Sequence, residues 1–145
     1  MLKTPLNILL ADDDIDDRLF FSKALKEMPF STKLATVHDG DELMNYLNMN
    51  LINLPDILFL DLSMPRKTGF ECLFEIKGNP KLMNMPVVMF STSFKSNDKY
   101  ELSMIETLKG IGAQDYIRKP DEFLLLKQAI QPILLKEIEK GEQIV

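Results

Sequence analysis

The sequence contains few cysteine, histidine and basic residues, and each shortage excludes a class of protein. The single cysteine, Cys72, cannot form an intramolecular disulfide, which is typical of proteins in a reducing cytosol. We expect its side chain to be an unreactive part of the core. The single histidine, His38, lies near a turn, where we expect a solvated side chain and not half of a catalytic pair. Lysine and arginine total 17 against 22 acidic residues, and the net charge of −5 argues against a nucleic-acid-binding surface, which needs clustered basic residues.

The sequence also lacks a long apolar run, an internal repeat and a low-complexity linker. No stretch approaches the roughly 20 apolar residues that a membrane-spanning helix requires, and the first residues, MLKTPLN, are unlike a signal peptide. A length of 145 residues is typical of one domain. We therefore expect a single cytoplasmic domain over residues 1–145, with a core at about 5–135 and a charged tail at about 136–145.

Short apolar runs alternate with segments of helical periodicity along the whole chain. Strands are predicted at Asn7–Ala11, Lys33–Val37, Asp56–Leu60, Val87–Phe90 and Gln114–Arg118. Helices are predicted at Asp16–Met28, Asp41–Asn48, Gly69–Lys77, about Asn97–Lys109, and after Pro120. This alternation predicts a flavodoxin-like, doubly wound α/β fold with a parallel five-stranded sheet, for which strand order 2-1-3-4-5 is a common form.

Polar residues follow four of the five predicted strands. These are Asp12–Asp14 after the first strand, Asp61 after the third, Ser91 after the fourth and Lys119 after the fifth. The carboxyl ends of parallel strands meet at one edge of the sheet, which is where ligands bind in such folds. Three carboxylates about 5 Å apart repel by roughly 3 kcal/mol per pair at an effective dielectric constant near 20, so their clustering indicates a bound cation. Carboxylate oxygens suit Mg²⁺, and a lysine and a hydroxyl suit phosphoryl oxygens.

Four motifs in this order resemble a response-regulator receiver domain of two-component signalling: ILLADDD, ILFLDLSMPRKTG, PVVMFSTS and DYIRKP. The resemblance covers about residues 5–135. It implies that Asp61 accepts a phosphoryl group from a sensor histidine kinase or a histidine phosphotransfer protein, with Mg²⁺ or substitute Mn²⁺ as cofactor. It implies no enzymatic activity beyond the domain's own phosphorylation and dephosphorylation.

The resemblance also implies which residues hold the metal ion. Asp12 and Asp13 match the acidic pair of the family, and they would bind the ion together with Asp61. Ser63, two residues after the phosphoacceptor, would offer its backbone carbonyl. Asp14 is better interpreted as the N-cap of the first helix.

A second group of matches concerns the phosphoryl group and the conformational switch. Ser91 matches the switch hydroxyl, although the adjacent Thr92 leaves an alternative. Tyr116 matches the switch aromatic, with a plain half-buried strand residue as the other interpretation. Lys119 matches the phosphate-pairing lysine, and the Lys119–Pro120 bond resembles the cis peptide of the family.

Several features bear on partners. No DNA-binding or enzymatic segment follows the predicted receiver, so we expect output by phosphorylation-dependent protein contact, as a monomer or weak homodimer, without nucleic acid or membrane. The chain is similar to single-domain regulators found beside hybrid kinases or bacterial phytochromes. The segment 92–118 is longer than in an ordinary receiver, and Pro132 predicts a break or bend near Ala129–Pro132. Leu19 and Phe20 cannot both join the core stripe of the first helix, and the exposed one is a candidate contact for the kinase.

The residues leave two other functions to compare with a receiver. A phosphatase of the haloacid-dehalogenase type also uses an aspartate nucleophile with Mg²⁺, but that family has a second aspartate where this chain has Ser63. A phosphorylation-independent interaction domain with a relict site is the other alternative. The complete set of Asp12, Asp13, Asp61, Ser91 and Lys119 argues against it.

Overall fold

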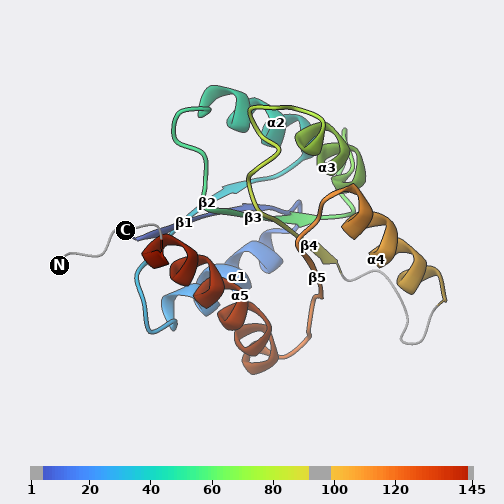
Figure 1. Ribbon diagram of the computed structural model, residues 1–145. Coiled ribbons are helices and arrows are strands. Elements are labelled where there is room, and N and C mark those ends of the chain that lie inside the picture. The colour runs from blue at the N-terminus through green and yellow to red at the C-terminus, as the bar shows by residue number, and fades with distance from the viewer. Residues whose placement is uncertain (1–4, 92–98, 144–145) are drawn as a thin grey trace.

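The computed structural model describes residues 5–91 and 99–143, in which strands and helices alternate (Figure 1). The strands are β1 (Leu6–Ala11), β2 (Thr32–Val37), β3 (Ile57–Asp61), β4 (Val87–Ser91) and β5 (Asp115–Arg118). The helices are α1 (Ile15–Lys26), α2 (Gly40–Met49), α3 (Gly69–Lys77), α4 (Lys99–Ile111) and α5 (Phe123–Gln143). Every predicted element is present, and the described bounds agree within two residues. The predicted start of the fourth helix at Asn97 lies outside the described residues.

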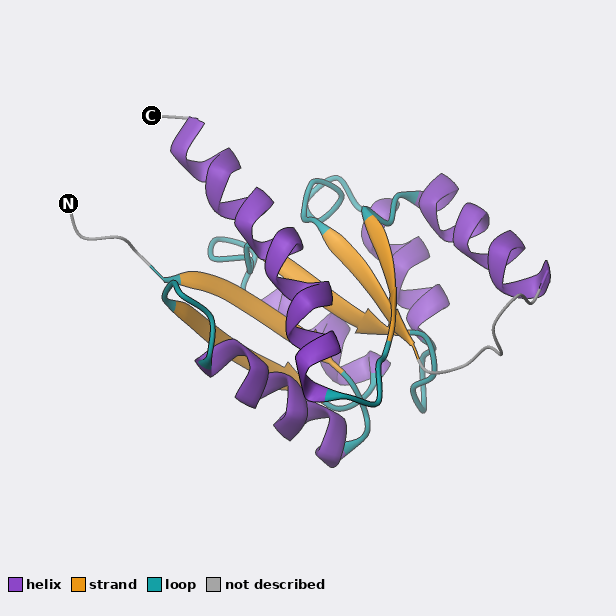
Figure 2. Ribbon diagram, turned by 90° about the horizontal axis from the view of Figure 1, so that it is seen from below, coloured by secondary structure: helices purple, strands orange, loops and turns teal. Residues whose placement is uncertain are grey.

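The five strands form one parallel sheet in the order β2-β1-β3-β4-β5. Both the doubly wound fold and the predicted strand order are confirmed. Helices α1 and α5 lie side by side on one face of the sheet (Figure 2), and α2, α3 and α4 cover the other. Since helices cover both faces, β3 and β4 are buried along their whole length, which explains their continuous apolar sequences.

The core has two layers because successive residues of a strand point to opposite faces of the sheet. Along β1, Leu9 packs among side chains of α2 and α3, whereas Leu10 packs among those of α1 and α5. The second layer contains an aromatic cluster in which Phe21 of α1 lies edge-on to Phe59 and Phe90, with ring centroids 5.0 and 5.7 Å away. This packing fixes α1 against the strands that carry the polar residues.

Of the break or bend expected near Ala129–Pro132, helix α5 shows no break. It continues without interruption from Phe123 to Gln143, with Pro132 inside it. A proline in a helix costs about 3 kcal/mol, whereas burial of one large aliphatic side chain contributes about 1.5–3 kcal/mol. Ile130, Ile133 and Leu134 are all buried, so tertiary packing outweighs the local cost. None of the described helices is long and apolar enough to cross a membrane.

Candidate functional site

Three of the predicted acidic residues meet at the carboxyl edge of the sheet. One carboxylate oxygen from each of Asp12, Asp13 and Asp61 lies within 4.8 Å of the others. Asp12 is fully buried and Asp61 is 5% exposed, whereas Asp13 faces solvent and leaves the cluster open on one side. Three hard oxygen donors with one open side fit a divalent cation such as Mg²⁺ or Mn²⁺.

The loops that follow β1 and β3 orient two of these carboxylates. The backbone N–H of Asp14 donates to Asp12 Oδ1 at 2.9 Å, and the backbone N–H of Ser63 donates to Asp61 Oδ1 at 3.1 Å. Gly69 permits the second loop, because a Cβ atom at this position would lie 2.0 Å from the carbonyl oxygen of Asp61. The backbone therefore binds the Oδ1 atom of both Asp12 and Asp61.

Lys119 joins the acidic residues to one another. Its ammonium nitrogen lies 2.6 Å from Asp12 Oδ2, 3.0 Å from Asp61 Oδ2 and 2.9 Å from Asp17 Oδ2, and its side chain is 7% exposed. It also lies 5.3 Å from the centre of the Phe90 ring. An ammonium group has three N–H donors, so these carboxylates take up its full capacity. The sequence predicted Asp12, Asp61 and Lys119 as neighbours but did not indicate Asp17.

Burial and charge oppose each other in this cluster. Burial raises the pKa of Asp61 to about 6, although the positive charge of Lys119 acts in the other direction. Burial also raises the pKa of Asp12. Burial alone would lower the pKa of Lys119, but its bonds to Asp12 and Asp17 and the charge of Asp61 outweigh that effect and keep the lysine protonated. The site thus pairs one permanent cation with carboxylates that are costly to ionise without further positive charge.

Ser91 and Tyr116 are also brought together. Ser91 is buried at the end of β4, and its side chain forms a hydrogen bond with that of Tyr116, which is half-buried on β5. The Tyr116 hydroxyl donates to Glu101 Oε2 at 3.2 Å, and Glu101 also forms an ion pair with Arg118. Glu101 belongs to α4 and was not indicated by the sequence. The alternative hydroxyl, Thr92, lies outside the described residues.

Four further expectations can be compared with the structure. Asp14 is the N-cap of α1, as predicted, and accepts hydrogen bonds from the N–H groups of Asp16 and Asp17 at 2.8 and 3.3 Å. His38 is exposed and Cys72 is buried, both as expected. The expectation of a cis Lys119–Pro120 bond is wrong, because no cis peptide bond occurs in the described ranges. The trans form is also the ordinary ground state of a bond before proline.

Comparison with known proteins gives a consistent picture. The model of the response regulator receiver domain family matches residues 8–131. The response regulator Rcp1 of Synechocystis is 35% identical over 105 residues, which cover 68% of this chain and 71% of Rcp1.

Two solved structures share the fold over most of both chains. The phosphorylated cyanobacterial phytochrome response regulator RcpA is 32% identical with a TM-score of 0.74, covering 90% of this chain and 91% of RcpA. The Mn²⁺-bound form of response regulator Rcp1 is 28% identical with a TM-score of 0.75, covering 89% of this chain and 91% of Rcp1.

Proposed function

The chain belongs to the response regulator receiver family of two-component signalling, and from this premise we propose that Asp61 is its phosphoacceptor. The donor is the phosphohistidine of a sensor histidine kinase or of a histidine phosphotransfer protein. One observation carries the proposal: the Asp61 carboxylate belongs to the cluster of oxygen donors and is also 3.0 Å from the ammonium of Lys119. An acceptor at this position would have a cation on one side and the phosphate-pairing ammonium of Lys119 on the other. Membership of this family sets aside the haloacid-dehalogenase alternative.

The transfer uses the residues of the chain in distinct roles. An oxygen of the Asp61 carboxylate attacks phosphorus, the P–N bond of the phosphohistidine breaks, and the imidazole leaves with the electron pair. Lys119 exchanges its bond to Asp61 Oδ2 for one to a phosphoryl oxygen. A divalent cation, held by Asp12, Asp13, Asp61 and the carbonyl of Ser63, would neutralise charge on the transferred group.

We also propose that Ser91 and Tyr116 form the switch. The Ser91 hydroxyl would turn from Tyr116 toward a phosphoryl oxygen, and Tyr116 would rearrange in response. This would alter the surface of α4, β5 and α5 and hence the binding of a protein partner. The size of the shift is limited by how differently the phosphoryl group contacts the two states.

The relatives suggest the kind of kinase. RcpA is described as a phytochrome response regulator, and this chain matches it over most of its length. We therefore propose a phytochrome-type or hybrid histidine kinase as the phosphoryl source, and a receiver that acts as a monomer or weak homodimer.

Phosphorylation by a small donor tests the acceptor directly. The protein is incubated with acetyl phosphate and Mg²⁺, and its intact mass is measured. We expect one added phosphoryl group in the parent, none in Asp61→Asn, and none in the parent when the metal is chelated. Full labelling of Asp61→Asn would contradict the proposal, and a parent that stays unlabelled would favour a relict site.

A further inference from the structure

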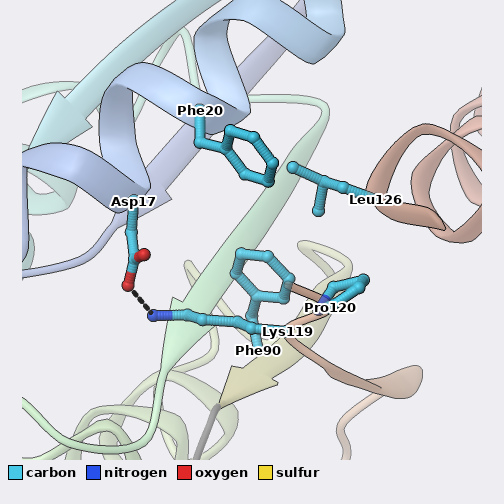
Figure 3. Close-up of a pocket in the computed structure, with 6 residues that line it drawn as sticks. All are labelled: Asp17, Phe20, Phe90, Lys119, Pro120 and Leu126. Atoms are coloured by element: carbon cyan, nitrogen blue, oxygen red, sulfur yellow. Dashed lines mark hydrogen bonds and ion pairs between the residues drawn. The ribbon is translucent and has the colours of Figure 1, made fainter. Parts of the chain in front are cut away.

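We propose that Asp17 is a positioning residue for Lys119, a role that rests on the proposed function of Asp61. Asp17 lies in the first turn of α1, and its Oδ2 is 2.9 Å from the lysine ammonium. Figure 3 shows the Lys119 side chain extending past the Phe90 ring to end at Asp17. These three side chains line a small pocket together with Phe20, Pro120 and Leu126.

Asp17 differs from the other two carboxylates that bind Lys119. Asp12 and Asp61 belong to the oxygen cluster that suits a cation, and Asp61 is also the proposed phosphoacceptor. Cation binding and phosphoryl transfer would therefore draw both away from the lysine. Asp17 is outside the acidic cluster found in the described residues. It is the carboxylate that stays available to hold the ammonium while the other two bind the metal and the phosphoryl group.

The backbone around Asp17 is well restrained. The Asp14 carboxylate caps α1 and accepts a hydrogen bond from the Asp17 N–H at 3.3 Å. The neighbouring Arg18 donates from its guanidinium to the carbonyl oxygen of Asp12 at 2.8 Å, which ties the same turn to the β1 loop. A carboxylate on such a support can fix the end of a long lysine side chain, which otherwise has many rotamers.

The experiment compares three single variants of the full chain. Asp17→Ala should lower the maximal rate of phosphorylation by acetyl phosphate about tenfold, as expected for loss of one hydrogen bond between charged groups. The Mg²⁺ concentration for half-maximal rate should stay unchanged, because Asp17 is not in the metal cluster. Asp17→Asn should recover most of the rate, since the amide oxygen still accepts from Lys119. Asp16→Ala is the matched control and should keep the parent rate, because it removes an exposed carboxylate from the same turn.

A double variant separates positioning from a general loss of structure. In a Lys119→Ala background, Asp17→Ala should cause no further decrease, since the group that it positions is gone. The ¹⁵N signal of the Lys119 ammonium, recorded with Mg²⁺ and beryllofluoride, should show a restrained group in the parent and in Asp17→Asn but a mobile one in Asp17→Ala.

Each outcome decides between the two proposals. A parent rate for Asp17→Ala, or a tenfold decrease that persists without Lys119, would overturn the role of Asp17 and leave Asp61 as acceptor. A parent that is not phosphorylated would overturn the role of Asp61, and the ammonium signal would then decide the role of Asp17 independently.

Discussion

The hydroxyl of Tyr116 donates a hydrogen bond to Glu101 Oε2 at 3.2 Å and so joins β5 to the first turn of α4. Glu101 is 6% exposed, and Arg118 Nε donates to the same oxygen at 3.2 Å. Burial raises the pKa of Tyr116, while the hydrogen bond to Ser91 acts to lower it. The single proton of the phenol goes to Glu101, so Ser91 is the donor in its bond to Tyr116. A hydroxyl has one proton. Ser91 therefore cannot donate to a phosphoryl oxygen until it leaves Tyr116.

Removal of the Tyr116 hydroxyl should make activation easier. In Tyr116→Phe the Ser91 hydroxyl loses the partner that competes with the phosphoryl group, and a net hydrogen bond is worth about 0.5–1.5 kcal/mol. The apparent affinity for beryllofluoride with Mg²⁺ should rise roughly threefold to tenfold, measured by NMR titration. Tyr46→Phe, on α2, is the control and should leave the affinity unchanged. An affinity that falls in Tyr116→Phe would show that the tyrosine hydroxyl helps the active state.

Loss of the Ser91 hydroxyl should separate phosphorylation from its consequence. Ser91→Ala keeps Asp61, Lys119 and the acidic cluster, so it should still bind beryllofluoride and accept phosphate. The amide shifts that beryllofluoride induces in α4, β5 and α5 should be mostly lost, because no hydroxyl follows the phosphoryl group. Shifts as large as those of the parent would assign the trigger to another residue, and Thr92 would be tested next.

The acidic cluster should destabilise the protein when no metal is bound. Asp13→Asn removes one of three neighbouring carboxylates and should raise the free energy of unfolding without metal by roughly 1 kcal/mol, because Asp13 faces solvent and its repulsion is screened. Mg²⁺ should raise the melting temperature of the parent by mass action, and this effect should largely disappear in the variant. Asp41→Asn, an exposed acid in the first turn of α2, is the control and should bring no gain. A lower melting temperature for metal-free Asp13→Asn would contradict electrostatic strain.

Most of the fold and of the site followed from the sequence for local reasons. The strands β1, β3 and β4 are buried on both faces, so each is visible in the sequence as a continuous apolar run. Side chains that follow parallel strands must share one edge of the sheet. The sequence alone therefore predicts that Asp12, Asp13, Asp61 and Lys119 lie together. The roles of Ser91 and Tyr116 came from the resemblance and remain predictions.

The residues that the sequence did not reveal depend on tertiary contacts. Asp17 lies in the first turn of α1, where any acid is favourable beside the helix dipole, so nothing in the pattern points to Lys119. Glutamate is the kind of residue expected at a solvated helix position. The burial of Glu101 depends on its contacts with Arg118 and Tyr116 from β5. Pro132 shows the converse, since the local rule predicts a break that α5 does not have because its neighbours are buried.

Metal binding should weaken at low pH because the proton competes for Asp61. Burial raises the pKa of Asp61 to about 6, so between about pH 4 and pH 6 the native carboxyl keeps a proton that the unfolded chain has lost. This proton stabilises the native state at low pH, and the benefit is lost as pH rises through 6. A cation must displace the same proton, so Mg²⁺ affinity should be about tenfold lower at pH 5 than at pH 8. Calorimetry in buffers of different ionisation enthalpy should show proton release at pH 5 and almost none at pH 8. Equal affinity at both values would contradict a raised pKa.

The exposed face of α1 should affect transfer from a kinase but not from a small donor. Leu19 is 63% exposed, and Ile15, one turn earlier on the same face, is 61% exposed, whereas Phe20 packs against Phe123 with ring centroids 5.4 Å apart. Leu19 is therefore the candidate contact of the two considered. Leu19→Ala should slow phosphotransfer from the cognate kinase roughly tenfold, since burying one leucine at an interface is worth about 1.5 kcal/mol or more, while labelling by acetyl phosphate should not change. Ile52→Ala, which shortens a 96% exposed aliphatic side chain in the loop before β3, is the matched control and should leave both rates unchanged. Equal transfer rates for the parent and Leu19→Ala would place kinase recognition on another surface.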